Sequence, residues 1–209
     1  MTMLEMREQN LNVAKALGYP VNESLPVLDD PEEIRSLSDT TDRMLCLNAV
    51  VASSYGFSKN KAMKWLEREG AVNHLAESEK EYLQSESDEM ANAQKQWQVE
   101  ALWALAWCVG CHDQLDFADS CSDGFIQMLP DIAKDESTER FRETLNLRNV
   151  PEILQKADLA YCLHWAVRDA ETRGHKAPGK VPGNVVAERR RALDWVIAED
   201  QWDDLTLDT

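Results

Sequence analysis

Long apolar segments are missing from this sequence of 209 residues. No run of about 18 apolar residues occurs, so the sequence predicts no membrane-spanning helix. The first eight residues already include two glutamates and an arginine, and they lack the apolar stretch of a signal peptide. We therefore expect a cytoplasmic protein that does not bind membranes.

Basic residues are scarce relative to acidic ones. The chain has 22 Lys and Arg against 38 Asp and Glu, a formal net charge of −16, and both halves carry the excess. Such a charge repels nucleic-acid phosphates and favours a basic protein partner. Lys176 and Lys180 are too few to form a nucleic-acid patch, so none is expected. A simpler interpretation is that the acidity serves only solubility.

Several motifs of known chemistry are also absent. The sequence has no glycine-rich phosphate loop and no E-x-x-H spacing of the kind found in di-iron bundles. No alternating Val, Ile and Thr runs flank Asn-Gly or Asp-Gly turns, so strands have little support. The five cysteines are an odd number, and a cytoplasmic chain of this length needs no disulfides.

Helical spacing of apolar residues recurs along the chain. Capping signals divide it into segments, such as Asp30-Pro31-Glu32-Glu33 at one helix start and Asn149-Val150-Pro151-Glu152 at another. The sequence predicts an all-α, single-domain helical bundle, with residues 1–90 as an N-terminal layer packed on a helical core of residues 91–209. The predicted helices cover residues 3–17, 30–56, 58–70, 77–92 with a break near 85–87, 97–109, 149–173 and 184–198.

The segment from Trp97 to Val109 differs from the other predicted helices. Between Val99 and Val109 only Glu100 is polar. A helix that is apolar all round is buried on all sides, so this segment should be the central helix of the bundle. Its three tryptophans would supply a large buried area.

Residues 110–139 are acidic and rich in loop-forming residues. They contain eight acids and one base, Lys134. We expect a long surface loop that is the best candidate for contact with a basic partner. The candidate partner-binding residues are Asp113, Asp116, Asp119, Asp123, Asp131, Asp135 and Glu136.

The run Cys108-Val109-Gly110-Cys111-His112 has the C-x-x-C-H form of covalent haem attachment. A haem protein of this kind needs export, which this N-terminus does not predict, so no cofactor is expected. Cys108, Cys111, His112 and Cys121 could instead bind zinc as four nitrogen and sulfur ligands. A redox dithiol is a further alternative. The plainest interpretation is a helix that ends at Gly110, with incidental thiols.

The two C-terminal helices place ionisable groups among Trp and Leu residues. A catalytic hypothesis makes His164 a general base oriented by Glu100 or Glu188, with Arg189 or Arg191 binding an anion. A structural hypothesis makes the same groups a buried polar network that holds the helices in register. We favour the network, formed by Glu100, Asp158, His164, Arg168, Glu188 and Arg191.

Four ordered motifs carry a family resemblance. They are W-x-x-E-A-L-x-A-L-x-W from Trp97, D-L-x-Y-x-L-H-W-A-x-R-D-A from Asp158, E-R-x-R-A-L-x-W from Glu188, and a terminal W-D-D…D-T from Trp202. From about residue 95 onward, the chain resembles a family of uncharacterised bacterial proteins with a domain of unknown function. The resemblance implies a common fold and a bacterial source, and it brings no catalytic residues.

Two classes of function remain. The favoured one is a non-catalytic acidic binding protein, most concretely an immunity-type inhibitor that neutralises a basic bacterial toxin. The alternatives are an enzyme that uses His164 and a structural zinc protein that uses Cys108. The sequence does not fix an oligomeric state.

Overall fold

The computed structural model describes residues 2–86 and 88–209, and within these residues it contains helices and no strands. This confirms the predicted all-α fold. The α-helices are α1 (Met3–Ala16), α2 (Leu37–Ser54), α3 (Lys59–Arg68), α4 (Glu77–Gln84), α5 (Glu89–Trp97), α6 (Val99–Cys108), α7 (Glu139–Glu143), α8 (Val150–Thr172) and α9 (Gly183–Ile197). Short 3-10 helices are η1 (Val72–His74), η2 (Phe125–Met128) and η3 (Ile132–Lys134).

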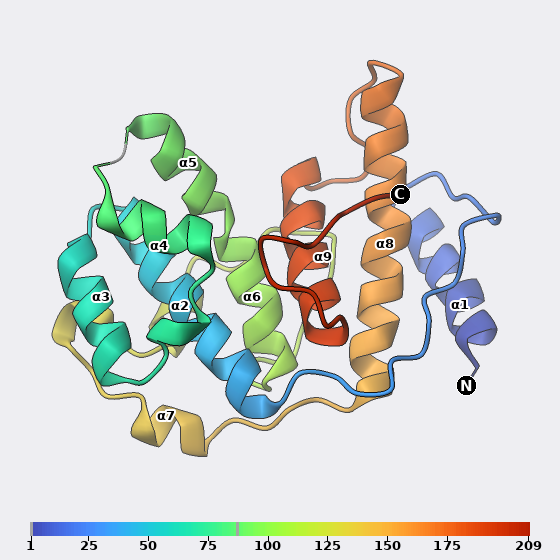
Figure 1. The fold of residues 1–209 in the computed structure, drawn as a ribbon. Helices are drawn as coiled ribbons and strands as arrows, with labels where there is room; N and C mark the ends of the chain where they lie inside the picture. The colour runs from blue at the N-terminus through green and yellow to red at the C-terminus, as the bar shows by residue number, and fades with distance from the viewer. Residues whose placement is uncertain (1, 87) are drawn as a thin grey trace.

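The helices follow one another across the molecule in an order that differs from their order in the chain. From one side to the other, α1 packs on α8, α8 on α9, α9 on α6 and α6 on α2, with α3 and α4 beyond (Figure 1). The first helix therefore lies beside the C-terminal helices, on the far side of the molecule from α3. Residues 1–90 therefore contact the helices of residues 91–209 at two separate places, through α1 on α8 and through α2 on α6.

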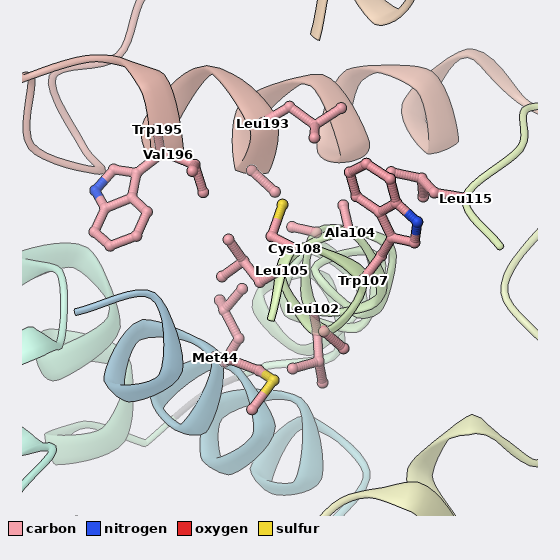
Figure 2. Close-up of a cluster of buried hydrophobic side chains, with 14 of the residues drawn as sticks. Met44, Leu102, Ala104, Leu105, Trp107, Cys108, Leu115, Leu193, Trp195 and Val196 are labelled. Carbon is pink, nitrogen blue, oxygen red and sulfur yellow. The ribbon is translucent and has the colours of Figure 1, made fainter. Parts of the chain in front are cut away.

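Helix α6 is the centre of the hydrophobic core. Its residues from Ala101 to Cys108 are buried, apart from the half-buried Trp103. Seen along its axis, α6 has α9 on one side and α2 on the other, with Leu105 and Trp107 among the interdigitating side chains (Figure 2). The buried central helix agrees with the sequence expectation. Trp97 does not, because it ends α5 and is 43% exposed.

The predicted helix start at Asp30-Pro31 is wrong. Helix α2 begins at Leu37, where the Ser36 side chain accepts a hydrogen bond from the backbone N–H of Asp39. The residues before it are held in an extended path by α9, because the backbone N–H of Arg35 donates to Val196 O and its Nε donates to Trp195 O. These tertiary bonds outweigh a good local capping signal.

Other predicted boundaries are close to those observed. Helix α3 begins after the capping residue Ser58, and α8 begins after Asn149, whose side chain accepts from the backbone N–H of Glu152. The predicted break near residues 85–87 falls between α4 and α5, and residue 87 of this prediction lies outside the described residues. In the described part of the chain, no helix is both long enough and apolar enough to cross a membrane.

Candidate functional site

Buried ion pairs tie neighbouring helices together. Each pair joins an arginine to a carboxylate on a different helix, and both side chains of each pair are at most 8% exposed. Charged groups in such dry surroundings are tolerated only when they are paired and hydrogen-bonded. The three pairs are Arg7–Asp158 between α1 and α8, Arg43–Glu79 between α2 and α4, and Arg189–Glu100 between α9 and α6.

The Arg189–Glu100 pair also fixes the first part of the acidic segment. Arg189 donates to the backbone carbonyls of Asp116 and Asp119, while Glu100 Oε1 accepts from the backbone N–H of Cys121 at 3.0 Å. The ion pair between α6 and α9 thus holds the backbone of the acidic segment at residues 116–121. A cavity of about 280 Å³ opens here, and Asp113, Asp116 and Asp119 contribute to its lining.

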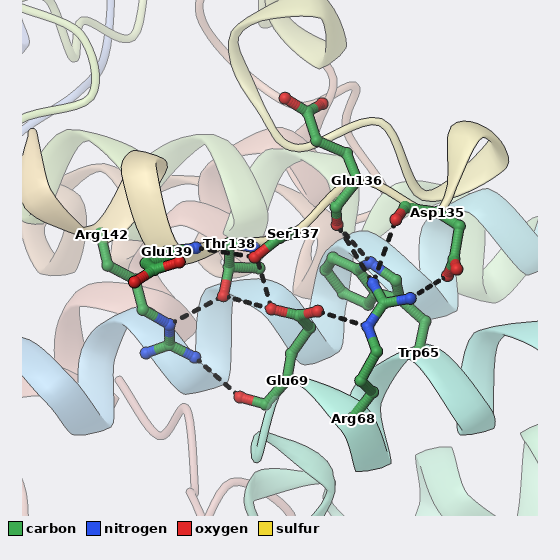
Figure 3. Close-up of polar contacts among 9 residues, drawn as sticks. All are labelled: Trp65, Arg68, Glu69, Asp135, Glu136, Ser137, Thr138, Glu139 and Arg142. Carbon is green, nitrogen blue, oxygen red and sulfur yellow. Dashed lines mark hydrogen bonds and ion pairs between the residues drawn. The ribbon is translucent and has the colours of Figure 1, made fainter.

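The second part of the acidic segment is attached to α3 (Figure 3). Trp65 Nε1 donates to the carbonyl of Glu136 at 2.8 Å, and Arg68 forms an ion pair with Asp135 at 2.5 Å. Glu69 Oε2 accepts from both the backbone N–H and the hydroxyl of Thr138, at 2.8 and 2.7 Å. Because Thr138 is buried, these bonds fix the backbone directly after the acids.

The predicted partner-binding acids lie at the surface. Asp113, Asp116, Asp119, Asp123, Asp135 and Glu136 are exposed, and Asp131 is partly exposed. Some of these acids bond to residues close to them in the sequence. Asp116 Oδ1 accepts a hydrogen bond from the backbone N–H of Ala118, and Asp131 forms an ion pair with Lys134 at 2.8 Å. Ile126 and Met128 lie between these acids in the sequence, and their large apolar side chains are 46% and 49% exposed. The segment therefore offers both acidic and apolar contacts.

The negative charge of the chain is a property of its surface. Among the described residues, the buried charged side chains are four arginines and four acids, so their charges cancel. The formal net charge of −16 therefore belongs to groups that retain contact with solvent. The buried acids are Asp42, Glu79, Glu100 and Asp158, and the buried arginines are Arg7, Arg43, Arg189 and Arg190.

His164 is buried against Arg190. The histidine is 5% exposed, and Arg190 Nη1 donates to its Nδ1 at 2.8 Å. Burial, and then the charge of Arg190, lower the pKa of His164 to about 4. A cavity of about 590 Å³ lies beside this histidine, but the other four residues of the catalytic hypothesis do not line it. Glu100 and Arg189 pair with each other, but the proposed catalytic set does not gather around the cavity beside His164.

The expected polar network has different partners from those we assigned. Asp158 pairs with Arg7, not with a C-terminal arginine, and it also accepts from Asn10 Nδ2 at 2.9 Å. Arg168 lies at the surface and pairs with Glu171 at 2.6 Å. In α9 the ion pairs are formed by Arg189, which pairs with Glu100, and by Arg190, which pairs with Asp194. The half-buried Arg191 and Glu188 have no ion pair among the described residues.

Glu188 is an unusual member of α9. Its Oε2 is buried and has no hydrogen-bond partner among the described residues. Burial raises the pKa of this carboxyl, and the charges of Arg191 and Lys95 offset part of that effect. Among the described residues no hydrogen bond joins Glu188 to His164, whose Nδ1 contacts Arg190 instead.

The C-x-x-C-H run ends α6. Gly110 has a positive φ of 74° and Cys111 N donates to Ala106 O, the geometry of a glycine helix stop. His112 stacks on Trp103 with ring centroids 3.6 Å apart, and burial lowers its pKa. Burial raises the pKa of the Cys108 thiol to about 12.

The four residues of the zinc hypothesis do not gather in the structure. Across the residues that the structure describes, no three His, Cys, Asp or Glu side chains gather as metal ligands, so Cys108, Cys111, His112 and Cys121 do not form one site. The same residues show no disulfide. His112 stacks on Trp103, whereas Cys108 is buried in the hydrophobic core, so the two side chains lie in different surroundings.

Several residues that shape the site had only a weak signal in the sequence. Arg7 and Asn10 lie on α1, and Arg43 lies on α2, and all are buried. The available signal was their position on the apolar side of predicted helices, where a polar residue requires a partner. No local pattern identified which distant carboxylate each would meet.

Taken together, the fold and the site define an all-α protein whose acidic surface segment is anchored on one buried ion pair and on α3. The chain belongs to the family described as Domain of unknown function (DUF4272), whose model matches residues 6–205. The match includes the first helices, which the motif resemblance from about residue 95 left out. Neither a curated protein nor a solved structure matches the chain.

Proposed function

We propose that this protein is a non-catalytic binding protein that uses the acidic segment of residues 113–136 to recognise a basic protein. The observation that carries the proposal is the anchoring of this segment. Arg189 holds its first part and Trp65 holds its second part, while its carboxylates remain exposed. A surface that is ordered before binding loses less conformational entropy on association.

The mixed character of the segment also fits a protein partner. Protein interfaces combine an apolar centre with a polar rim. Here Ile126 and Met128 are the exposed apolar residues, with Asp123 before them and Asp131 after them in the chain. The negative surface would speed association with a basic protein through electrostatic steering.

The narrower form of the proposal is an immunity-type inhibitor that covers the active site of a basic toxin. It rests on the acidic charge and on the failure of the candidate catalytic residues to converge. An inhibitor of this kind acts by occupying a basic substrate-binding surface, so it needs no catalytic group of its own.

The test is association with the product of the neighbouring gene, measured by biolayer interferometry at several salt concentrations. We expect binding whose association rate falls as salt rises. Inhibition of that protein's activity at one-to-one stoichiometry would support the narrower form. Absence of binding at every salt concentration, together with no partner recovered by co-purification, would overturn the proposal.

A further inference from the structure

We infer that the groove between α2 and the η2–η3 segment holds a long basic side chain, lysine or arginine, of the protein partner. This inference rests on the proposed function and adds the place where the partner is anchored. The groove has a volume of about 450 Å³. Its apolar walls include Ala52 of α2, Phe57, Ile126 and Leu129.

One polar side chain that lines the groove has an acceptor atom without a partner among the described residues. Asn48 is 3% exposed and lines the groove. Its Nδ2 donates to the carbonyl of Pro130 at 3.3 Å, and because a carbonyl only accepts, this contact fixes the orientation of the amide. Oδ1 has no partner among the described residues, yet it is not sealed from solvent. The amide oxygen is thus an available acceptor at the base of an apolar groove.

The rim of the groove supplies a negative charge. Glu136 lines it, and one of its carboxylate oxygens accepts from the backbone N–H of Asp131 at 2.8 Å. In Figure 3 this carboxylate points away from Trp65 and Arg68. The remaining charges of the rim, Asp131 and Lys134, pair with each other. Glu136 therefore forms no ion pair among the described residues, although the charge of Lys134 lies close enough to attract it.

A long basic side chain matches these features. Its aliphatic stem buries apolar area along the walls while its charged head keeps polar contacts. The head would donate hydrogen bonds to Asn48 Oδ1 and the Glu136 carboxylate, both of which accept. An acidic side chain would face two acceptors and gain nothing. Lys61 and Lys64 of α3 line an adjacent cavity that shares Phe57 with the groove, and neither lysine lines the groove itself.

The probe is the peptide acetyl-Gly-Arg-Gly-amide, titrated into the full chain and followed by NMR. Its control is the same peptide with citrulline, which keeps the shape of arginine and removes the charge. We expect the arginine peptide to shift the side-chain amide signals of Asn48 and the methyl signals of Ile126 and Ile132. Citrulline should give a shift several-fold smaller at equal concentration.

Two variants test the location. Ala52→Leu fills the groove from a half-buried helical position, and Glu136→Gln removes the rim charge while keeping an acceptor for Asp131 N. Each should weaken arginine-peptide binding at least fivefold, whereas Val13→Leu on α1, at the other side of the molecule, should leave it unchanged. The NMR spectrum of each free variant reports whether it is folded.

The inference and the proposed function can fail separately. If the arginine and citrulline peptides shift the same signals equally, or if neither shifts the groove signals, the inference is overturned. If Ala52→Leu also leaves the affinity for the basic protein partner unchanged, the anchor lies elsewhere on the acidic segment and the proposed function stands. If that partner fails to bind the unaltered protein, the proposed function itself falls.

Discussion

Arg189 of α9 donates from both Nε and Nη2 to the same oxygen of Glu100 on α6, at 2.9 and 2.7 Å. The guanidinium group then reaches two backbone carbonyls of the acidic segment, at Asp116 and Asp119. One buried side chain therefore connects the central helix, the last helix and the proposed binding surface. A change at this pair should affect both stability and the order of the loop.

Replacing Arg189 with alanine should destabilise the protein strongly. The substitution leaves Glu100 buried without its charge partner, which costs about 3–5 kcal/mol. The control is Arg191→Ala, at a half-buried residue with no ion pair among those described, and it should cost about 1 kcal/mol or less. Urea unfolding measures both values. Equal losses for the two variants would contradict the assignment of the pair.

The loop should respond to Glu100 as well. Glu100→Gln replaces a charged acceptor for the backbone N–H of Cys121 with a neutral one. We expect faster hydrogen exchange at the amide of Cys121 and at its neighbours in the loop, while the amides of α8 stay protected. An exchange increase that is uniform over the chain would instead indicate general destabilisation, and the loop would not depend specifically on this pair.

Arg7 should hold α1 on α8. Arg7→Ala removes the partner of Asp158, whose side chain is fully buried, and should cost about 3–5 kcal/mol. The double variant Arg7→Met with Asp158→Leu removes both charges and should be more stable than Arg7→Ala. Thermal unfolding compares them, and limited proteolysis should show cleavage after α1 only in the single variant. A double variant less stable than Arg7→Ala would contradict this explanation.

Arg190 couples two groups whose titrations oppose each other. The pKa of His164 falls to about 4 and that of Asp194 rises to about 6, in each case mainly through burial. A histidine with a lowered pKa adds stability as pH rises from about 4 to 6.5. An aspartate with a raised pKa removes stability as pH rises from about 3.8 to 6. Each effect is worth about 3 kcal/mol, so they nearly cancel.

Replacing either His164 or Asp194 should reveal the effect of the other residue on the pH dependence of stability. Relative to the unaltered protein, the unfolding free energy of His164→Asn should fall by about 3 kcal/mol as pH rises from 4 to 6.5. That of Asp194→Asn should rise by a similar amount. Asparagine keeps an acceptor for Arg190 in both cases. Urea unfolding across this pH interval gives the slopes, and two slopes of the same sign would show that the pKa values of His164 and Asp194 are not shifted in opposite directions.

Zinc should have no stabilising effect, and the buried thiols should react slowly. Cys108 is fully buried, and the pKa of its thiol and that of Cys121 rise to about 12, so little thiolate forms near neutral pH. We expect an unchanged melting temperature with zinc or with a chelator. We also expect that modification of Cys108 by a thiol reagent requires unfolding. A rise in melting temperature with one equivalent of zinc would revive the metal hypothesis.

The sequence predicted what is local and missed what depends on distant partners. The apolar run of residues 99–109 identified the central helix because no exposed helix could carry it. Asn149 and Ser58 marked helix starts through their own side chains. Asp30 and Pro31 gave an equally good signal that failed, because Arg35 bonds to the end of α9 instead.

The candidate site divides in the same way. The acidic segment is visible in composition, so its surface position was predictable from charge alone. Its order was not, because Arg189 and Trp65 reach it from helices far away in the sequence. The pairing of Asp158 with Arg7, across 151 residues, likewise has no local signature.

The most direct test of the acidic binding surface is a charge-matched comparison of association rates with the basic partner. The surface variant changes Asp113, Asp119 and Asp123 to asparagine, and the control changes Glu8, Glu32 and Glu33 to glutamine, so both lose three exposed negative charges. The surface variant should bind about tenfold more slowly or worse, and the control should bind nearly as fast as the unaltered protein. Equal rates for the two variants would contradict the assignment of the acidic segment as the binding surface.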